Sequence, residues 1–262
     1  MNIGAHYLGK RVVVTGCSSG IGQATARLLV EAGADVHGLD IKPAELDLAS
    51  FRYLDLRDLR SIDSAALSIS GPIDALFNCA GIPPGPSPID VMKVNFVGTR
   101  YLTELLVPKM APGSAVANVA SNGGAGWPQR LALLKELTAT ESFEAAAAWY
   151  EQNAPALPSA YSVSKEAVIV WTMRASGDWI KRGIRVNCTS PGAVQTPMLD
   201  EIQKVTPAAL IDVVAQPIGR RSSAEEQAWP LLFLNCPLAS YINGATLPVD
   251  GGFIASGIVA AR

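Results

Sequence analysis

Short apolar, β-branched runs recur along the chain, and segments with helical apolar spacing separate them. The runs predict seven strands, at 12–14, 35–40, 51–56, 73–81, 114–121, 184–189 and 245–252, the fourth and the last leading into turns. Continuous apolar runs are typical of strands buried on both faces. Their alternation with helices across short connections predicts an α/β fold with a parallel sheet covered on both faces. We see no linker, repeat or low-complexity tract, so we expect one domain over residues 1–262.

A glycine-rich turn joins the first strand to the first helical segment. It reads Thr15-Gly16-Cys17-Ser18-Ser19-Gly20-Ile21-Gly22. Glycines let the backbone approach a pyrophosphate closely, and the free N–H groups of the helix start point at its charge. A purely structural turn is the alternative, but the strand before it and the helix after it favour a dinucleotide site.

The ends of the second and third strands carry groups suited to an adenosine. Asp40 closes the second strand, 18 residues beyond Gly22. Its carboxylate is suited to accept hydrogen bonds from both ribose hydroxyls and to repel a 2′-phosphate, which favours NAD over NADP. Lys42 weakens that preference, but the glycine turn contains no Arg or Lys, so we expect NAD. Asp55 and Leu56, at the end of the third strand, are suited to contact an adenine edge.

A tyrosine and a lysine four residues apart form the candidate chemical centre. Tyr161 and Lys165 share one helical face, and the apolar run 166–171 supplies the face that packs against a core. A nearby Lys⁺ favours phenolate, so we expect a tyrosine pKa lowered towards the range of a general acid or base. A surface pair on an amphipathic helix is the alternative. Ser121 ends the fifth strand, at the edge where open α/β sheets bind ligands.

Composition narrows the remaining possibilities. Of 262 residues, 49% are hydrophobic and 17% are charged, and the net charge of −2 gives no reason to expect a nucleic acid or membrane partner. No apolar run is long enough to span a bilayer, and the first residues lack a signal-peptide layout. We expect neither a disulfide framework nor a metal site, because the histidines and cysteines are scattered: His6, His37, Cys17, Cys79, Cys188 and Cys236. We therefore expect a cytoplasmic protein.

Taken in order, these motifs resemble those of the short-chain dehydrogenase/reductase family over essentially the whole chain. The residues that carry the resemblance are the turn Thr15 to Gly22, Asn78-Cys79-Ala80-Gly81, Tyr161-x-x-x-Lys165, Pro191-Gly192 and Asp250-Gly251-Gly252. The resemblance implies a Rossmann-type doubly wound sheet and the interconversion of an alcohol and a carbonyl compound by hydride transfer with NAD.

The resemblance also implies roles for individual residues. Tyr161 would be the general acid in reduction and the general base in oxidation, and Ser121 would orient the substrate oxygen. Lys165 would hold the nicotinamide ribose and lower the tyrosine pKa, and Asn95 would anchor a water that links Lys165 to solvent. The implied cofactor contacts are Gly16, Ser18, Ser19, Gly20, Ile21, Gly22, Asp40, Asp55, Leu56, Asn78, Ala80, Gly81, Tyr161, Lys165, Pro191, Gly192, Val194 and Thr196, the last two at the carboxamide end.

The spacing between Ser121 and Tyr161 departs from the family, in which the two usually lie much closer than the 40 residues found here. The additional residues, about 127–158, show apolar residues at near-helical spacings and predict one or two short amphipathic helices before the tyrosine helix. The apolar positions are Leu131, Leu134, Leu137, Phe143, Ala147 and Tyr150. A second segment, about 197–217, is less regular and is suited to be a lid.

This layout resembles a bacterial subgroup that contains 3α-hydroxysteroid dehydrogenase/carbonyl reductases and coniferyl-alcohol dehydrogenases. In the steroid enzymes the insertion is associated with blocking the usual helix-helix dimer face, and it is suited to the same role here. The alternative is that the insertion is only a packed addition to the surface. We expect its aromatic residues Trp127, Trp149 and Tyr150 to line the mouth of a pocket for a hydrophobic substrate.

The sequence thus favours an NAD-dependent oxidoreductase for a hydrophobic aromatic or alicyclic alcohol or its ketone, similar to coniferyl-alcohol dehydrogenase. The alternative within this class is a 3α-hydroxysteroid dehydrogenase/carbonyl reductase. The alternative from another class is a non-catalytic NAD-binding redox sensor, which is expected to lack the Tyr, Lys or Ser kept here. The resemblance favours a homodimer or homotetramer.

Overall fold

Seven parallel strands form one sheet in the order β3-β2-β1-β4-β5-β6-β7. The computed structural model describes residues 3–85, 87–204 and 206–260. The strands are β1 Arg11–Thr15, β2 Asp35–Asp40, β3 Ser50–Tyr53, β4 Ile73–Asn78, β5 Met110–Val119, β6 Arg185–Pro191 and β7 Thr246–Val249. This order, which reverses direction at β1 and β4, confirms the predicted doubly wound Rossmann-type fold.

The centre of the sheet is buried on both faces, as its apolar runs predict. Val12, Val13 and Val14 of β1 are fully buried. Thr15 pairs with Leu39 of β2 on one side and with Asn78 of β4 on the other, so the carboxyl ends of the three strands are level. The loops that follow these strands therefore meet at one edge.

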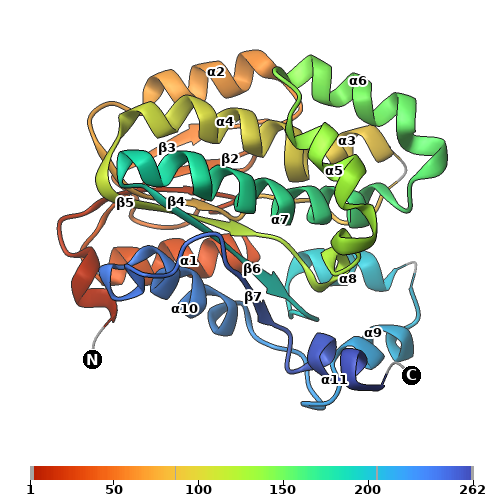
Figure 1. The fold of residues 1–262 in the computed structure, drawn as a ribbon. Coiled ribbons are helices and arrows are strands. Elements are labelled where there is room, and N and C mark those ends of the chain that lie inside the picture. Colours follow the sequence, from red (N-terminus) through yellow and green to blue (C-terminus); the bar gives the residue numbers. More distant parts are fainter. Residues whose placement is uncertain (1–2, 86, 205, 261–262) are drawn as a thin grey trace.

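Helices cover the sheet in two layers (Figure 1). One face packs against α1 Gly20–Glu31 and α10 Ala224–Asn235, and the other against α2 Leu59–Ser68, α4 Gly98–Leu106 and α7 Ala160–Trp179. Each layer has its own apolar core, and the larger one lies on the α7 side. Helix α7 therefore rests on β5 and β6 with its first turns at the carboxyl edge of the sheet.

The helical stretch that contains Asn95 begins at Pro88. Helix α3, Pro88–Met92, continues through a π-helical turn, Lys93–Val97, into α4. Proline at the first position suits a helix start, because its missing N–H would have no intrahelical partner. π-helical turns are rare and recur at functional sites, and this one contains Asn95.

The insertion forms two helices, as predicted. They are α5 Leu131–Thr138 and α6 Phe143–Asn153, with 3₁₀ turns before and after them at Trp127–Arg130 and Ala154–Ala156. Of the six predicted apolar positions, Leu131 is half-buried and the other five are buried: Leu134, Leu137, Phe143, Ala147 and Tyr150. Figure 1 shows the pair on the outer side of α3, α4 and α7, away from the sheet.

Two short helices, α8 Pro197–Gln203 and α9 Ala208–Val214, occupy the segment predicted to be irregular. A final helix, α11 Phe253–Ala260, ends the described chain. Within the described ranges, no helix has both the length and the hydropathy that crossing a membrane requires.

Candidate active site

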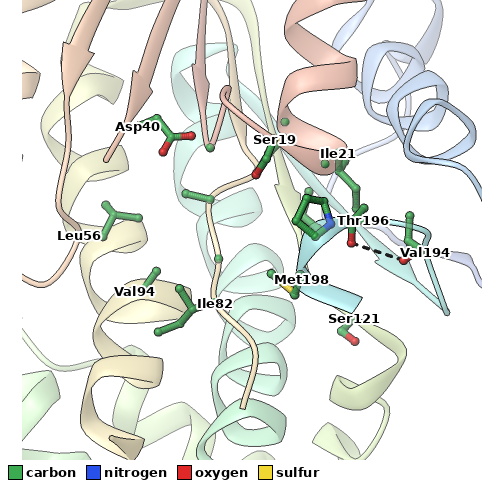
Figure 2. A pocket seen from close by; sticks show the side chains of 18 of the residues that line it. Ser19, Ile21, Asp40, Leu56, Ile82, Val94, Ser121, Val194, Thr196 and Met198 are labelled. Atoms are coloured by element: carbon green, nitrogen blue, oxygen red, sulfur yellow. Dashed lines mark hydrogen bonds between the residues drawn. The ribbon is translucent and has the colours of Figure 1, made fainter. Parts of the chain in front are cut away.

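A cavity of about 450 Å³ opens at the carboxyl edge of the sheet, between the glycine-rich turn, the first turns of α7 and helix α8 (Figure 2). The structure brings 17 of the predicted site residues to its wall: Gly16, Ser19, Gly20, Ile21, Gly22, Asp40, Asp55, Leu56, Ala80, Gly81, Ser121, Tyr161, Lys165, Pro191, Gly192, Val194 and Thr196. The remaining three, Ser18, Asn78 and Asn95, lie behind that wall.

The glycine-rich turn has no room for side chains where it crosses the sheet edge. A Cβ on Gly22 would lie 2.0 Å from the carbonyl oxygen of Gly16, and a Cβ on Gly16 would lie 2.7 Å from Ala80. Gly16 and Gly20 have φ of 71° and 54°, the left-handed region that glycine adopts readily. The bare backbone at the start of α1, where the Ser19 side chain makes no capping bond, fits the pyrophosphate of a dinucleotide.

The Asp40 carboxylate is oriented by two backbone amides. One oxygen accepts a hydrogen bond from the Ser18 N–H at 2.9 Å, and the other accepts one from the Lys42 N–H at 3.1 Å. Ser18 thus acts on the cavity through its backbone, while its hydroxyl donates to the carbonyl oxygen of Lys42. The carboxylate lies on the cavity wall and keeps acceptor capacity for ribose hydroxyls.

Arg57 was missed by the sequence analysis. Its guanidinium binds the Asp55 carboxylate in a bidentate pair, with donor–acceptor distances of 2.9 and 2.7 Å. These hydrogen bonds lower the pKa of Asp55. The carboxylate therefore faces an arginine that itself lines the cavity, and an adenine contact by Asp55 stays a prediction. The only sequence signal for this pair was the i, i+2 spacing, which is too common to be informative.

Tyr161 and Lys165 project from the first turns of α7 into the cavity. The Lys165 ammonium lies 5.8 Å from the centre of the Tyr161 ring and donates a 3.0 Å hydrogen bond to the carbonyl oxygen of Val119. Ser121 follows β5, and its hydroxyl oxygen accepts a 3.0 Å hydrogen bond from the Gly123 N–H. The three side chains thus meet on one wall, as the helical and strand-end spacing predicts.

The pKa of Tyr161 differs from the expected direction. Burial raises it above its ordinary value, and the neighbouring Ser121 hydroxyl offsets this only in part. The expectation of a lowered pKa was wrong for the protein without ligand, because the cost of removing a phenolate from water outweighs the hydrogen bond from Ser121. Burial also lowers the pKa of Lys165, to about 8, since an ammonium in the same dry environment favours its neutral form.

Asn95 fixes the chain next to Lys165. Its side-chain oxygen accepts a hydrogen bond from the Ile82 N–H at 2.8 Å, and its side-chain N–H₂ donates to the Ile82 carbonyl oxygen at 3.0 Å. The same amide donates to the Ser164 hydroxyl at 3.3 Å, which connects the π-helical turn to α7. Its predicted water-anchoring role stays a prediction.

Asn78, at the end of β4, forms buried hydrogen bonds with α4 and β5. Its side-chain N–H₂ donates to the Thr103 hydroxyl at 2.9 Å and to the Asn118 side-chain oxygen at 2.8 Å. These bonds join β4 to α4 and β5, so the side chain is directed away from the cavity wall. A cofactor contact by Asn78 stays a prediction.

The mouth of the cavity is built by residues other than those predicted. Among the described residues, the insertion's aromatic side chains Trp127, Trp149 and Tyr150 are not part of the wall; they pack against the α7-side core. That expectation was wrong because the insertion lies on the far side of α7. The apolar wall comes instead from α8 and two core positions, with Met198, Leu199, Ile202, Ile82 and Val94.

The segment before α8 lies against the glycine-rich turn. A Cβ on Gly20 would lie 3.2 Å from the methyl carbon of Thr196, and the Thr196 hydroxyl donates to the Val194 carbonyl oxygen at 3.4 Å (Figure 2). Helix α8 begins at the next residue, Pro197. The position of α8 is thus linked to the turn suited to the pyrophosphate.

Two family models match the chain. The one described as short chain dehydrogenase matches residues 10–132, which include the glycine-rich turn and Ser121. The one described as Enoyl-(Acyl carrier protein) reductase matches residues 140–254, which include Tyr161 and Lys165.

Similar proteins are named for alcohol and steroid dehydrogenation. A coniferyl-alcohol dehydrogenase of Pseudomonas sp. is 40% identical over 244 residues, covering 93% of this chain and 96% of that protein. A 3-alpha-hydroxysteroid dehydrogenase/carbonyl reductase of Comamonas testosteroni is 33% identical over 248 residues, covering 92% and 95%. The crystal structure of a Pseudomonas 3-alpha-hydroxysteroid dehydrogenase with NADH has a TM-score of 0.81 and 30% identity, covering 97% and 100%. The subgroup resemblance expected from the sequence is thereby confirmed.

Proposed function

Because the chain belongs to the short-chain dehydrogenase family, we propose that it is an NAD-dependent oxidoreductase that interconverts a hydrophobic alcohol and its carbonyl compound. The observation that carries the proposal is the convergence of Ser121, Tyr161 and Lys165 on the wall of a cavity that is also lined by the apolar side chains of Met198, Leu199 and Ile202. In a mainly apolar pocket, a few hydrogen-bonding side chains close together determine where the oxygen of a bound alcohol or ketone lies.

Proton transfer is assigned to Tyr161. A bound nicotinamide cofactor would supply the hydride acceptor for alcohol oxidation and the hydride donor for carbonyl reduction. The phenol of Tyr161 donates a proton to the carbonyl oxygen in reduction, and the phenolate takes the hydroxyl proton in oxidation. The Ser121 hydroxyl holds the substrate oxygen at hydrogen-bonding distance from that phenol. Because burial raises the tyrosine pKa, alcohol oxidation is favoured by alkaline pH.

Lys165 and Asn95 support the tyrosine. An ammonium on Lys165 stabilises the phenolate and hydrogen-bonds to ribose hydroxyls, and its pKa of about 8 lets it lose a proton near neutral pH. Asn95 holds the backbone at Ile82 beside that ammonium and provides a site for a relaying water.

The cofactor preference rests on Asp40. Its carboxylate repels a 2′-phosphate, whereas Lys42 and Arg57, on the same part of the wall, soften that repulsion. We propose NAD as the cofactor. An Asp40→Ala variant is expected to shift the kcat/KM ratio of NAD to NADP towards NADP by at least about tenfold, because the like-charge repulsion is lost. An unchanged ratio would count against this role of Asp40.

The substrate is an aromatic or alicyclic alcohol, similar to that of the coniferyl-alcohol dehydrogenase, which is the more similar of the two named relatives. A 3α-hydroxysteroid is the second candidate, supported by the steroid dehydrogenase relatives. A non-catalytic redox sensor is the alternative from another class.

We also propose that the chain is a single domain and that it assembles as a homodimer or homotetramer. We propose the cytoplasm as its location, because reduced thiols persist there and the four cysteines are free.

The test is the absorbance of reduced nicotinamide while the protein receives NAD or NADP with a panel of alcohols that includes coniferyl alcohol and a 3α-hydroxysteroid. We expect reduction of NAD with a narrow group of alcohols. The matched control is Tyr161→Phe, which removes one hydroxyl and is expected to lose at least about 100-fold in kcat. Undiminished turnover by that variant would refute the mechanism. Tight NAD binding with no turnover across the panel would favour the sensor.

A further inference from the structure

A half-buried arginine, Arg130, forms an ion pair with the buried carboxylate of Glu166 next to the proposed catalytic residues. Glu166 follows Lys165 on helix α7 and is fully buried, while the Arg130 side chain, from the first turn of the insertion, is 29% exposed. The Arg130 Nε donates to one carboxylate oxygen of Glu166 at 2.7 Å, and its Nη2 donates to the other. The insertion is therefore fastened to the helix that carries Tyr161 and Lys165.

The chain between Ser121 and Arg130 crosses α7 at very close range. A Cβ on Gly123 would lie 3.3 Å from the Tyr161 ring, and one on Gly124 would lie 2.9 Å from the backbone of Lys165. A Cβ on Gly126 would lie 2.7 Å from the Glu166 carboxylate and closer still to Arg130. Three glycines in four positions permit this approach, and they also leave the segment with little stiffness of its own.

A buried carboxylate is costly unless it is paired, and the pair adds little stability compared with apolar residues of the same shape. A chain that keeps such a pair beside its reactive groups gains defined geometry from the bidentate fork of the arginine. The fork joins the end of the glycine-containing segment that begins at Ser121 to helix α7, which carries Tyr161 and Lys165. The Arg130–Glu166 pair therefore matters for where it joins the two segments and not for the stability that it adds.

We propose that Arg130 and Glu166 are positioning residues, which hold the Ser121 hydroxyl in register with Tyr161 and Lys165. This inference rests on the proposed function for its kinetic consequence. When the pair is broken, the Ser121–Gly126 segment moves away from α7, and the substrate oxygen is no longer held at the tyrosine hydroxyl. The binding of NAD, which the glycine-rich turn and Asp40 support, is unaffected.

Arg100 provides a matched control, because it is another arginine that holds the insertion. It lies on α4 and is 1% exposed. Its guanidinium donates to the Thr140 hydroxyl at 2.9 Å and to the Ser142 carbonyl oxygen at 3.2 Å, between α5 and α6. Arg100 thus fastens the middle of the insertion, whereas Arg130 fastens the end next to Ser121.

The experiment compares Arg130→Met, Glu166→Gln, their double variant and Arg100→Met, using an alcohol that the wild type oxidises. We expect Arg130→Met to lower kcat about 10- to 100-fold, because even a small displacement of a reacting group slows the chemical step. The Kd for NAD is expected to stay unchanged. The double variant is expected to be no worse than Arg130→Met, since both changes release the same contact. Glu166→Gln, which keeps one acceptor for the guanidinium, is expected to lose less. Arg100→Met is expected to lower Tm but to keep kcat within about twofold.

Hydrogen–deuterium exchange provides a readout that needs no turnover. Arg130→Met is expected to accelerate exchange at residues 121–126, and Arg100→Met to accelerate it at residues 137–145 only. Unchanged exchange at 121–126 in Arg130→Met would overturn the inference, as would equal losses of kcat in Arg130→Met and Arg100→Met. If the wild type oxidises no alcohol, the proposed function fails, and the exchange result alone decides the inference.

Discussion

Two helical segments follow neighbouring strands of the sheet, and the chain uses them in opposite ways. The insertion follows β5, and its helices α5 and α6 bury their apolar side chains in the α7-side core. Leu134 and Leu137 are 1% and 0% exposed, as thoroughly buried as the residues of the sheet. Although it begins close to Ser121, the insertion has become part of the framework.

The segment after β6 has the opposite character. Its helices α8 and α9 are seven residues each, and on α9 Leu210 and Val213 remain 61% and 57% exposed. Yet this lightly packed segment supplies Met198, Leu199 and Ile202 to the cavity wall. Regions with few buried contacts open at low free-energy cost, and elements that close over ligands come from such regions. The comparison indicates that a tightly packed segment supports the site, whereas a loosely packed one supplies apolar residues to the cavity wall.

The largest expected effect is a loss of stability, without a change in KM, when the core of the insertion is altered. Leu137→Ala leaves a cavity in the core and is expected to lower the free energy of unfolding by about 2–5 kcal/mol. The KM for the alcohol is expected to stay unchanged, since the insertion is not part of the wall. Urea unfolding and steady-state kinetics measure the two quantities. Glu136→Ala, exposed on the same helix, is the control and is expected to stay within about 0.5 kcal/mol of the wild type. A raised KM with unchanged stability would reverse the assignment.

The next effect concerns Lys165, which lies beside both segments. Gly124, before the insertion, contacts its backbone, and a Cβ on Gly81 would lie 3.6 Å from its Nζ and 3.8 Å from the terminal methyl of Met198. Burial holds the pKa of Lys165 at about 8, below its ordinary 10.5. Between these values the unfolded chain binds more protons than the folded one, so this group makes stability rise with pH.

Lys165→Met removes the part of the pH dependence of the unfolding free energy that comes from Lys165 and leaves the other titrating groups in place. We expect the variant without ligand to be more stable than the wild type below about pH 8, by on the order of 2 kcal/mol, and the gap to close as pH rises towards about 10.5. Urea unfolding across this pH range measures the difference. Met198→Ala is expected to narrow the gap by admitting water, whereas Leu137→Ala leaves it as it is. A gap that does not depend on pH would show that Lys165 is not desolvated.

The glycine-rich turn was predictable from sequence because backbone geometry determines it. The spacing of Gly16, Gly20 and Gly22 reflects positions with positive φ or with no space for a Cβ, and any chain that makes this turn must use glycine there. Asp40 was predictable for a related reason, since the end of a strand determines where its side chain is directed.

The substrate half was not predictable to the same degree. The apolar spacing of the insertion correctly indicated helices with one buried face, but such a pattern does not reveal which surface covers that face. The rings of Trp127 and Trp149 were therefore assigned to the wrong wall. The raised pKa of Tyr161 and the Arg130–Glu166 pair depend on burial and on contacts between distant residues, and a local motif does not encode either of them.

The smallest expected effect tests the loosely packed wall directly. Met198→Ala removes apolar surface from the cavity and is expected to change the ratio of kcat/KM between a bulky and a small alcohol by about tenfold, in favour of the bulky one. Stability is expected to change little, because α8 buries few side chains. Leu210→Ala, exposed on α9 and outside the wall, is the control and should leave both the ratio and the stability unchanged. If Leu210→Ala altered the ratio as much as Met198→Ala did, the whole segment would act as one moving lid, and selectivity would reflect closure rather than contact with the substrate.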